Sequence, residues 1–311
     1  MMENFNHIPS VYWVFTQLCN DTCDHCYNHS GPQGERMNLE DCLKIVGHLP
    51  DQIDRLILSG GEPLAEKNLL YEILKAIQEK YVGKIRVMLQ TNGDLLTDKI
   101  LDKLLSLGIC RFDIASIDQY HTHKINHLSK LRSIFQKRNI PCDNDDNISY
   151  FLQEDIISWG YWGATEDLWL GGNWARGRAL ETNTWTQNPA HNFCALHSGA
   201  KNFLGGYDDV TQEISIQLWK IYPCCPGTKY PLGDARKNKV SEILSKVSSH
   251  PVFMALNAGE PFKMGEHLGI SPIEAEKQTE KLKNICLYCD LFFSTYMSEW
   301  NTESFIPLPV I

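Results

Sequence analysis

Three cysteines near the beginning of the chain, Cys19, Cys23 and Cys26, form the pattern C-x3-C-x2-C on one short stretch. Three thiolates on one loop can ligate three irons of a cubane iron–sulfur cluster and leave the fourth iron without a protein ligand. Zinc is the alternative, because thiolates also hold zinc, although zinc sites usually combine two short pairs of ligands. The pattern therefore favours an iron–sulfur cluster with an open iron.

A second group of cysteines lies between positions 194 and 289. Cys286 and Cys289 form a C-x2-C pair, and Cys224 and Cys225 follow a run rich in β-forming residues. A four-thiolate site can assemble from these segments and Cys194, and both zinc and an iron–sulfur cluster satisfy that number of ligands. A cluster with four protein thiolates has no free iron for a substrate. We expect electron transfer from it, with structural stabilisation as the alternative.

Alternating strand and helix patterns must position the first group. The strands are expected at 11–16, 55–58, 84–89 and 110–116, and the helices that follow them at 38–49, 67–81, 98–107 and 121–137. This alternation is typical of repeated βα units around a parallel sheet or barrel, whose active site lies at the carboxyl ends of the strands. The polar sequences that end these strands, including SGGEP, TNG and ASID, should therefore converge on one face.

One of these corners and a later segment carry further chemistry. Gly60 and Gly61 allow the backbone to approach a ligand closely, and Glu62 supplies an acceptor for an ammonium group. Arg176 and Arg178 can bind a carboxylate of a cofactor or substrate, with a plain surface position as the alternative.

The later part of the chain is less regular. Residues 148–163 fit a helix better than a strand, and a Thr/Asn-rich stretch at 181–192 reads as a linker. Beyond it we expect a hairpin-like pair of runs at 201–209 and 211–223 and helices at 239–247 and 272–284. The expected division is a core at 1–180, the linker at 181–192, a cysteine-rich domain at 193–290 and a C-terminal arm at 291–311.

The motifs CNDTCDHC, SGGEP, TNG and ASID resemble the radical S-adenosylmethionine (SAM) superfamily in content, order and spacing over residues 1–140. The resemblance implies an α/β fold with a partial (β/α)6 TIM-like barrel. It also implies a [4Fe–4S] cluster whose open iron binds SAM, and reductive cleavage of SAM to a 5′-deoxyadenosyl radical that abstracts hydrogen. A flavodoxin or ferredoxin type of protein is the expected reductant.

The same resemblance assigns roles to single residues. It implies that Cys19, Cys23 and Cys26 hold the cluster. The residues implied to bind SAM are Gly60, Gly61, Glu62 and Pro63 at its amino group, Asn92 and Ser116 at its carboxylate or ribose, and Arg178 at a carboxylate. The residue before the third cysteine is usually bulky and apolar or aromatic, and here it is His25. Histidine can stack on adenine as well, or Tyr27 can supply the aromatic surface.

The later motifs, from GRA at 177–179 through IYPCC to CLYC, resemble the SPASM region or its shorter form, twitch. Because no cysteine follows Cys289, the twitch form is the better match. It implies a smaller α+β domain with one auxiliary [4Fe–4S] cluster, held by Cys194, Cys224, Cys286 and Cys289. Cys225 is then spare: it can replace Cys224, donate a hydrogen atom to a substrate radical, or be a small buried residue.

Composition narrows the function classes. The chain has 311 residues, 43% of them hydrophobic, and a formal net charge of −9, which argues against a nucleic-acid partner. No apolar run is long enough to span a membrane, and the start of the chain does not read as a signal peptide, so a cytoplasmic enzyme is expected. In such a compartment the 11 cysteines are better read as metal ligands than as disulfides.

The expected reaction is the modification of a ribosomally made precursor peptide by epimerisation, cross-linking or backbone excision of the splicease type. Because only 18 residues precede Cys19, we expect a separate recognition protein to deliver the peptide. A small-molecule dehydrogenase or epimerase that acts on an aminoglycoside or polyol is the alternative. A non-catalytic zinc or iron–sulfur binding module is the alternative from another class.

Overall fold

The structure is a computed structural model, and it describes residues 5–118, 120–121, 126–153, 156–163, 174–185 and 187–298. These residues form an eight-stranded sheet with the order β5-β4-β3-β2-β1-β6-β7-β8. The strands are β1 (His7–Val14), β2 (Gln52–Ser59), β3 (Arg86–Thr91), β4 (Ile109–Ile114), β5 (Ser158–Tyr161), β6 (Glu213–Gln217), β7 (Lys220–Tyr222) and β8 (Gly233–Asp234). Strands β1 to β5 run parallel, β6 pairs with β1 in parallel, and β7 and β8 extend the sheet antiparallel.

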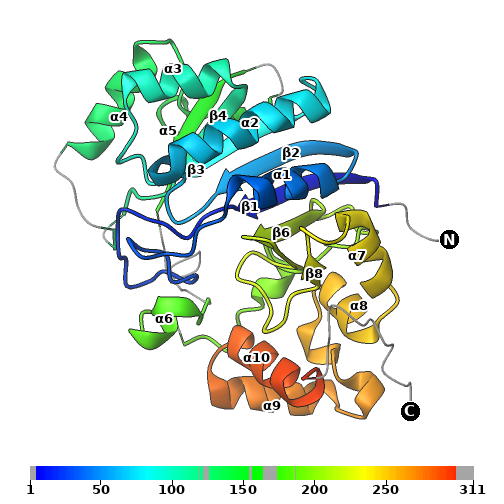
Figure 1. Cartoon of the computed structure of the whole chain (residues 1–311). Helices are drawn as coiled ribbons and strands as arrows, with labels where there is room; N and C mark the ends of the chain where they lie inside the picture. The colour runs from blue at the N-terminus through cyan, green and yellow to red at the C-terminus, as the bar shows by residue number, and fades with distance from the viewer. Residues whose placement is uncertain are drawn as a thin grey trace.

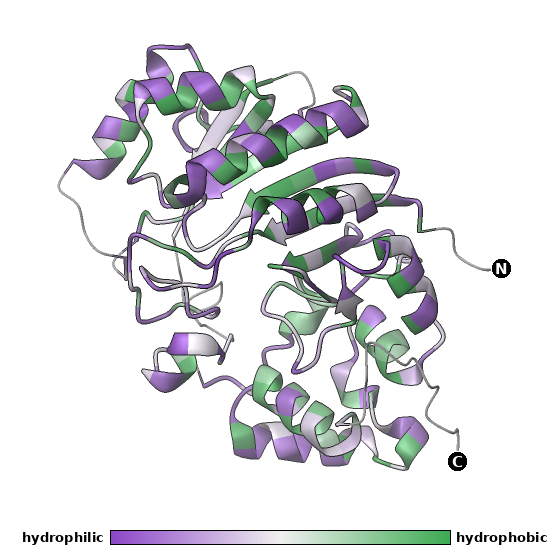
Figure 2. Ribbon diagram, viewed as in Figure 1, coloured by the Kyte–Doolittle hydropathy of each residue, from purple (hydrophilic) through white to green (hydrophobic). Residues whose placement is uncertain are grey.

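The helices are α1 (Leu39–His48), α2 (Lys67–Tyr81), α3 (Asp98–Ser106), α4 (His127–Gln136), α5 (Asp143–Asp146), α6 (Gly177–Glu181), α7 (Val240–Val247), α8 (Pro251–Asn257), α9 (Pro272–Leu282) and α10 (Ile285–Tyr296). Helices α1 to α3 connect successive parallel strands, as the sequence predicts. Side chains fix their starts: the Asn38 carboxamide accepts the Asp41 amide, and Thr97 accepts the Ile100 amide. Apolar and polar residues alternate along α2, as expected of a helix with one buried side (Figure 2).

Alternate residues of each strand face opposite sides of the sheet and enter different cores. Trp13 of β1 and Leu58 of β2 belong to a core shared with the helices α1 to α4 and α7 to α10. Tyr12 of β1, Ile57 of β2 and Met88 of β3 face the other side and pack in a smaller core. We call this side the inner face. The opposite side, which carries Trp13 and Leu58, is the outer face. Figure 1 shows α1 and α2 over this outer face and α7 to α10 gathered beside β6 and β8.

The α/β fold and its dominant parallel sheet are confirmed, and two expectations about single elements are wrong. Residues 158–161, placed in a helix, form β5, because Trp159 is buried there and stacks on Phe135 at 4.6 Å. The expected pairing of 201–209 with 211–223 is absent. Instead Asn202 closes a compact loop by bonding the carbonyl and amide of Tyr207, and β6 and β7 form the hairpin. Helix α10 continues past residue 290, where the C-terminal arm was expected to begin.

The predicted domain division stays a prediction, although the two regions share structure. Strands β6 to β8, from the predicted cysteine-rich domain, belong to the same sheet as β1, and one outer core continues under both regions. Within the described residues, every helix is too short or too polar to cross a membrane.

Candidate functional site

The first cysteine loop leaves the carboxyl end of β1 and is held against the end of β2. The amide of Gly61 donates to the carbonyl of Thr16 at 2.8 Å, and the amide of Glu62 donates to the carbonyl of Leu18 at 2.8 Å. A Cβ atom on Gly61 would lie 2.6 Å from the Leu18 oxygen, closer than real Cβ atoms come. The second glycine of SGGEP is therefore needed to let the two strand ends touch, and this contact positions Cys19.

The three thiols of this loop lie near one another and are partly withdrawn from solvent. Cys19 is 9% exposed, while Cys23 and Cys26 are half-buried. Burial, together with the nearby Glu62 and Cys26, raises the pKa of Cys19 to about 12. Three thiolates held this way need a positive partner, which the irons of a cluster would supply.

Backbone amides also point at these sulfurs. The Asp21 amide lies 3.4 Å from Cys19 Sγ, and the Ser30 amide lies 3.3 Å from Cys26 Sγ. Hydrogen bonds of this kind stabilise cluster thiolates and tune the cluster potential. The residues present therefore fit an iron–sulfur cluster.

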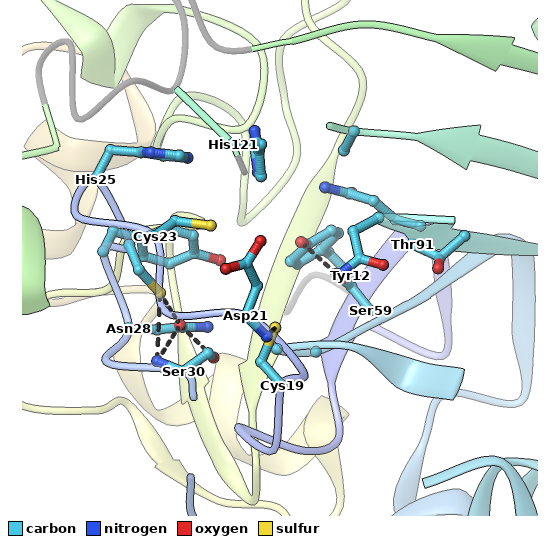
Figure 3. A pocket seen from close by; sticks show the side chains of 17 residues that line it. Tyr12, Cys19, Asp21, Cys23, His25, Asn28, Ser30, Ser59, Thr91 and His121 are labelled. Atoms are coloured by element: carbon cyan, nitrogen blue, oxygen red, sulfur yellow. Dashed lines mark hydrogen bonds between the residues drawn. The ribbon is translucent and has the colours of Figure 1, made fainter. Parts of the chain in front are cut away.

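A pocket opens between this loop and the ends of the parallel strands (Figure 3). Its lining includes the predicted residues Cys19, Cys23, His25, Cys26, Tyr27, Gly60, Gly61 and Asn92. Ser116 lies in an adjoining pocket, which shares Asn92 and His121 with the first. The hydroxyl of Ser116 donates to the carbonyl of Asn92 at 2.8 Å and so ties the ends of β3 and β4 together. The strand ends converge as the sequence predicts.

Glu62 has a different place from the expected one. It is fully buried and does not line the pocket. One carboxylate oxygen accepts the Leu64 amide at 2.9 Å and the Thr91 hydroxyl at 2.6 Å, and the other accepts the Asn92 amide at 2.8 Å. Glu62 therefore joins the ends of β2 and β3 instead of offering its carboxylate to a ligand. Pro63 begins the short 3-10 turn behind it (Pro63–Glu66).

His25 and His121 form one wall of the pocket. Their rings meet edge to face with centroids 4.6 Å apart, and His25 is only 3% exposed. Burial and the neighbouring His121 lower the pKa of His25 to about 4, so its ring is neutral at physiological pH. Asp118 Oδ2 lies 2.8 Å from His121 Nδ1 and orients that ring. His121 also lines the pocket, which its position at the start of an expected helix did not indicate.

One feature of this wall suits a different metal. Cys23, His25 and His121 place one ligand atom each within 4.8 Å of one another. A mixed sulfur and nitrogen set is one that zinc uses. Because this set shares Cys23 with the three-cysteine set, the two metals would exclude each other.

A segment far along the chain, residues 174–184, clamps the cysteine loop. The two terminal nitrogens of Arg178 donate to the carbonyls of Cys23 at 2.8 Å and Ser30 at 2.6 Å. The hydroxyls of Thr182 and Thr184 both donate to the carbonyl of Asp24 at 2.9 Å. Arg178 thus binds backbone carbonyls and is outside the lining of the pocket, which is a positioning contact, and its expected contact with a SAM carboxylate stays a prediction. No sequence motif predicted that this segment would hold the cysteine loop.

The second cysteine group is also brought together. Burial, and then the charges of Cys286, Cys289 and Cys224, raise the pKa of Cys194 well above its ordinary value, so all four thiols lie within electrostatic reach. Arg176 opposes this rise and forms an ion pair with Asp290. Arg176 therefore adds a buried positive charge to the four thiols, which is a role that sequence reasoning did not foresee.

The spare cysteine faces another direction. Cys225 is 6% exposed, and its sulfur lies 3.4 Å from the phenol oxygen of Tyr27. The charge of Cys224, by contrast, helps to raise the pKa of Cys194, so Cys224 lies close to the second group. This geometry favours Cys224 as the fourth member of the second group.

Comparison with known protein families finds a match to one family model. Residues 13–131 match the model of the Radical SAM superfamily, so the chain carries a radical SAM domain. The AdoMet-dependent heme synthase of Methanosarcina barkeri is 32% identical over 135 residues, which are 41% of this chain and 36% of that protein. The S-adenosyl-L-methionine-dependent 2-deoxy-scyllo-inosamine dehydrogenase of Niallia circulans is 34% identical over 101 residues, which are 30% of this chain and 39% of that protein. The chain therefore spans less than two fifths of either relative.

Two solved structures are also similar. BtrN in complex with AdoMet and 2-DOIA has 20% identity and a TM-score of 0.49, and the match covers 85% of this chain and 90% of that chain. Streptococcus suis SuiB bound to its precursor peptide SuiA has 14% identity and a TM-score of 0.45, covering 81% of this chain and 67% of that chain.

Proposed function

We propose that this chain is a radical SAM enzyme whose cluster is held by Cys19, Cys23 and Cys26. The observation that carries the proposal is the convergence of these thiols on a pocket at the strand ends, inside the region that matches the radical SAM domain. When bound there, the cluster and SAM together supply a 5′-deoxyadenosyl radical.

The chain's own residues would hold and orient SAM in this pocket. Gly60 and Gly61 line it without side chains, so their backbone can approach the methionyl group closely. The neutral ring of His25 can pack on adenine without repelling the sulfonium charge of SAM, which a protonated histidine would do. Asn92 offers a carboxamide at the end of β3.

The second group, Cys194, Cys224, Cys286 and Cys289, would hold an auxiliary [4Fe–4S] cluster. Four thiols, three of them buried and Cys224 half-buried, would occupy every iron of a cubane, which suits electron transfer better than substrate binding. Arg176 would balance part of the negative charge of the loaded site. A flavodoxin or ferredoxin type of protein would supply electrons to the enzyme.

The substrate proposed first is a ribosomally made precursor peptide, modified by epimerisation, cross-linking or backbone excision. A small-molecule dehydrogenase or epimerase is the second candidate, and it is supported by the similarity to the 2-deoxy-scyllo-inosamine dehydrogenase. A test is anaerobic incubation of reduced enzyme and SAM with each substrate class. A mass change or solvent deuterium in the peptide supports the first, and oxidation of an amino-sugar alcohol supports the second.

A non-catalytic zinc protein is the third candidate, favoured by the set of Cys23, His25 and His121. Metal analysis of anaerobically prepared protein separates it from the others. About eight irons per chain are expected for two [4Fe–4S] clusters. About one zinc and no iron would establish the zinc protein.

A further inference from the structure

A largely buried arginine lies beside the second cysteine group. The side chain of Arg176 is 12% exposed, and one terminal nitrogen of its guanidinium donates to Asp290 Oδ2. The other terminal nitrogen lies 3.5 Å from the carbonyl oxygen of Cys286. Among the described residues, the Nε atom of Arg176 is buried and has no hydrogen-bond partner. A buried N–H without an acceptor costs free energy, so this donor is left for a ligand of the second group.

The neighbouring carboxylate accounts for the donor that is left over. A bidentate carboxylate takes two parallel N–H donors of a guanidinium. Within the described part of the chain Asp290 Oδ1 has no hydrogen-bond partner either, so a single oxygen joins the pair and Nε stays unoccupied. Asp290 belongs to α10 and follows Cys286 by four residues and Cys289 by one. Residues three and four apart share a helix face, so α10 presents both thiols and the ion pair together.

The charge of Arg176 acts on all four thiols of the group. Burial raises the pKa of Cys224 to about 12 and that of Cys286 to about 11, and Arg176 is the strongest influence against each rise. Arg176 opposes the raised pKa of Cys194 and Cys289 as well. Asp290 has the reverse effect, because its negative charge adds to the rise at both thiols of α10. The two members of the ion pair therefore influence the second group with opposite signs.

The backbone around Arg176 fixes it in this position. Its amide donates to the carbonyl of Trp174 at 2.7 Å. The next residue, Gly177, packs on the first cysteine loop, where a Cβ atom would lie 2.3 Å from the carbonyl oxygen of Tyr27. Arg178 then bonds the same loop. Arg176 therefore cannot swing away from the second group without disturbing contacts at the first.

We propose that Arg176 is a positioning residue of the auxiliary cluster, to which its Nε–H donates, and that Arg176 and Asp290 shift the reduction potential of this cluster in opposite directions. Reduction adds one electron from the flavodoxin or ferredoxin type of reductant, so the loaded site becomes more negative. The charge and the hydrogen bond of Arg176 favour the reduced state and raise the potential, whereas the charge of Asp290 lowers it. The inference rests on the proposed auxiliary cluster and adds the residues that decide how easily it takes an electron.

An anaerobic redox titration of the full chain with both sites loaded, followed by electron paramagnetic resonance, tests this role. The signal of the second cluster is the one that addition of SAM leaves unchanged. In Arg176→Gln the reduction equilibrium of this cluster should shift about tenfold toward the oxidised state, which is about 59 mV for one electron. In Asp290→Asn, which keeps an acceptor oxygen for Arg176, the potential should rise instead.

Two conservative variants refine the titration. Arg176→Lys keeps the positive charge but lacks the Nε–H, so its potential should fall less than that of Arg176→Gln. Arg178→Lys is the matched control, because the same change is made two residues away in the same segment, where the side chain bonds the first loop. It should leave the potential of the second cluster at the wild-type value.

The signs of the shifts separate this role from a merely structural one. A structural role would lower the iron content in the variants of both residues without moving the potential in opposite directions. An unchanged potential in Arg176→Lys and Asp290→Asn, with about eight irons per chain, would overturn the inference alone, even if Arg176→Gln failed to fold. Wild-type protein that takes up only about four irons and shows no second signal would overturn the auxiliary cluster and the inference with it.

Discussion

The two cysteine groups are built in opposite ways. Cys19, Cys23 and Cys26 come from one loop, border an open pocket and are held largely by polar contacts from other segments. Cys194, Cys224, Cys286 and Cys289 come from three segments and are packed into the core, where the first, third and fourth are 7%, 5% and 4% exposed. A ligand can therefore reach the first site through its pocket, whereas the second site is largely buried, with Cys224 as its most exposed member.

The means of support differ as well. The first loop depends on the Gly60-Gly61 contact, the Glu62 network and the clamp at 174–184. The second depends on α10, whose buried side carries Cys286 and Cys289 together with Phe292 and Phe293. We therefore expect changes at the first site to alter SAM chemistry, and changes at the second to alter stability and electron supply.

The largest effect is expected from Cys26→Ala. It removes one of three ligands from the first site, so SAM cleavage should be abolished, while iron falls from about eight to about four per chain. Iron analysis and chromatography of 5′-deoxyadenosine measure both. Cys42→Ala, on the buried side of α1, is the control and should keep full iron and activity. Normal SAM cleavage by Cys26→Ala would show that the first group is not the reactive one.

Cys289→Ala tests the second cysteine group in the same way. It should lower iron from about eight to about four, because the second site cannot be closed without its fourth ligand. The midpoint of thermal unfolding should fall, since metal binding contributes to folding free energy. SAM cleavage should be reduced but not lost. Abolished cleavage with the first cluster spectroscopically intact would mean that the second site takes part in the chemistry itself.

Glu62→Gln probes the strand-end network with a smaller change. Both carboxylate oxygens accept hydrogen bonds, so the glutamine NH2 must face a donor such as the Asn92 amide. We expect the free energy of unfolding of the metal-free protein to fall by about 2 kcal/mol, measured by urea denaturation. The KM for SAM should rise more than kcat falls. If kcat collapses while KM stays unchanged, Glu62 acts on the chemistry directly.

The smallest effect is expected from Arg178→Lys. The ammonium of lysine lacks the rigid fork with which the guanidinium bonds the Cys23 and Ser30 carbonyls, so we expect one hydrogen bond to be lost, at a cost of about 1 kcal/mol. The first cluster should then decay faster in air while the second keeps its lifetime, which parallel spectra of the two clusters can show. Equal decay of both clusters would contradict the role of the clamp.

Local patterns predicted much of this structure. The parallel strands, their helices and the meeting of SGGEP, TNG and ASID follow from short-range periodicity and from the geometry of parallel sheets. Strand β5 was not predicted, because the spacing of its aromatic residues also fits a helix. The stacking of Trp159 on Phe135, a contact between distant residues, favours the strand. Arg178 bonds the Ser30 carbonyl, and Cys225 contacts Tyr27. Both contacts join residues more than 140 positions apart in the sequence, and no local sequence pattern predicts contacts between residues so far apart.

The most direct test of the account is the anaerobic release of 5′-deoxyadenosine from SAM by the reduced, iron-loaded wild-type protein, measured by mass spectrometry beside Cys23→Ala. We predict release by the wild type and none by the variant. Iron-loaded wild-type protein that binds SAM without cleaving it, under the same reductant, would contradict the central claim that the first cysteine loop forms a radical-generating site.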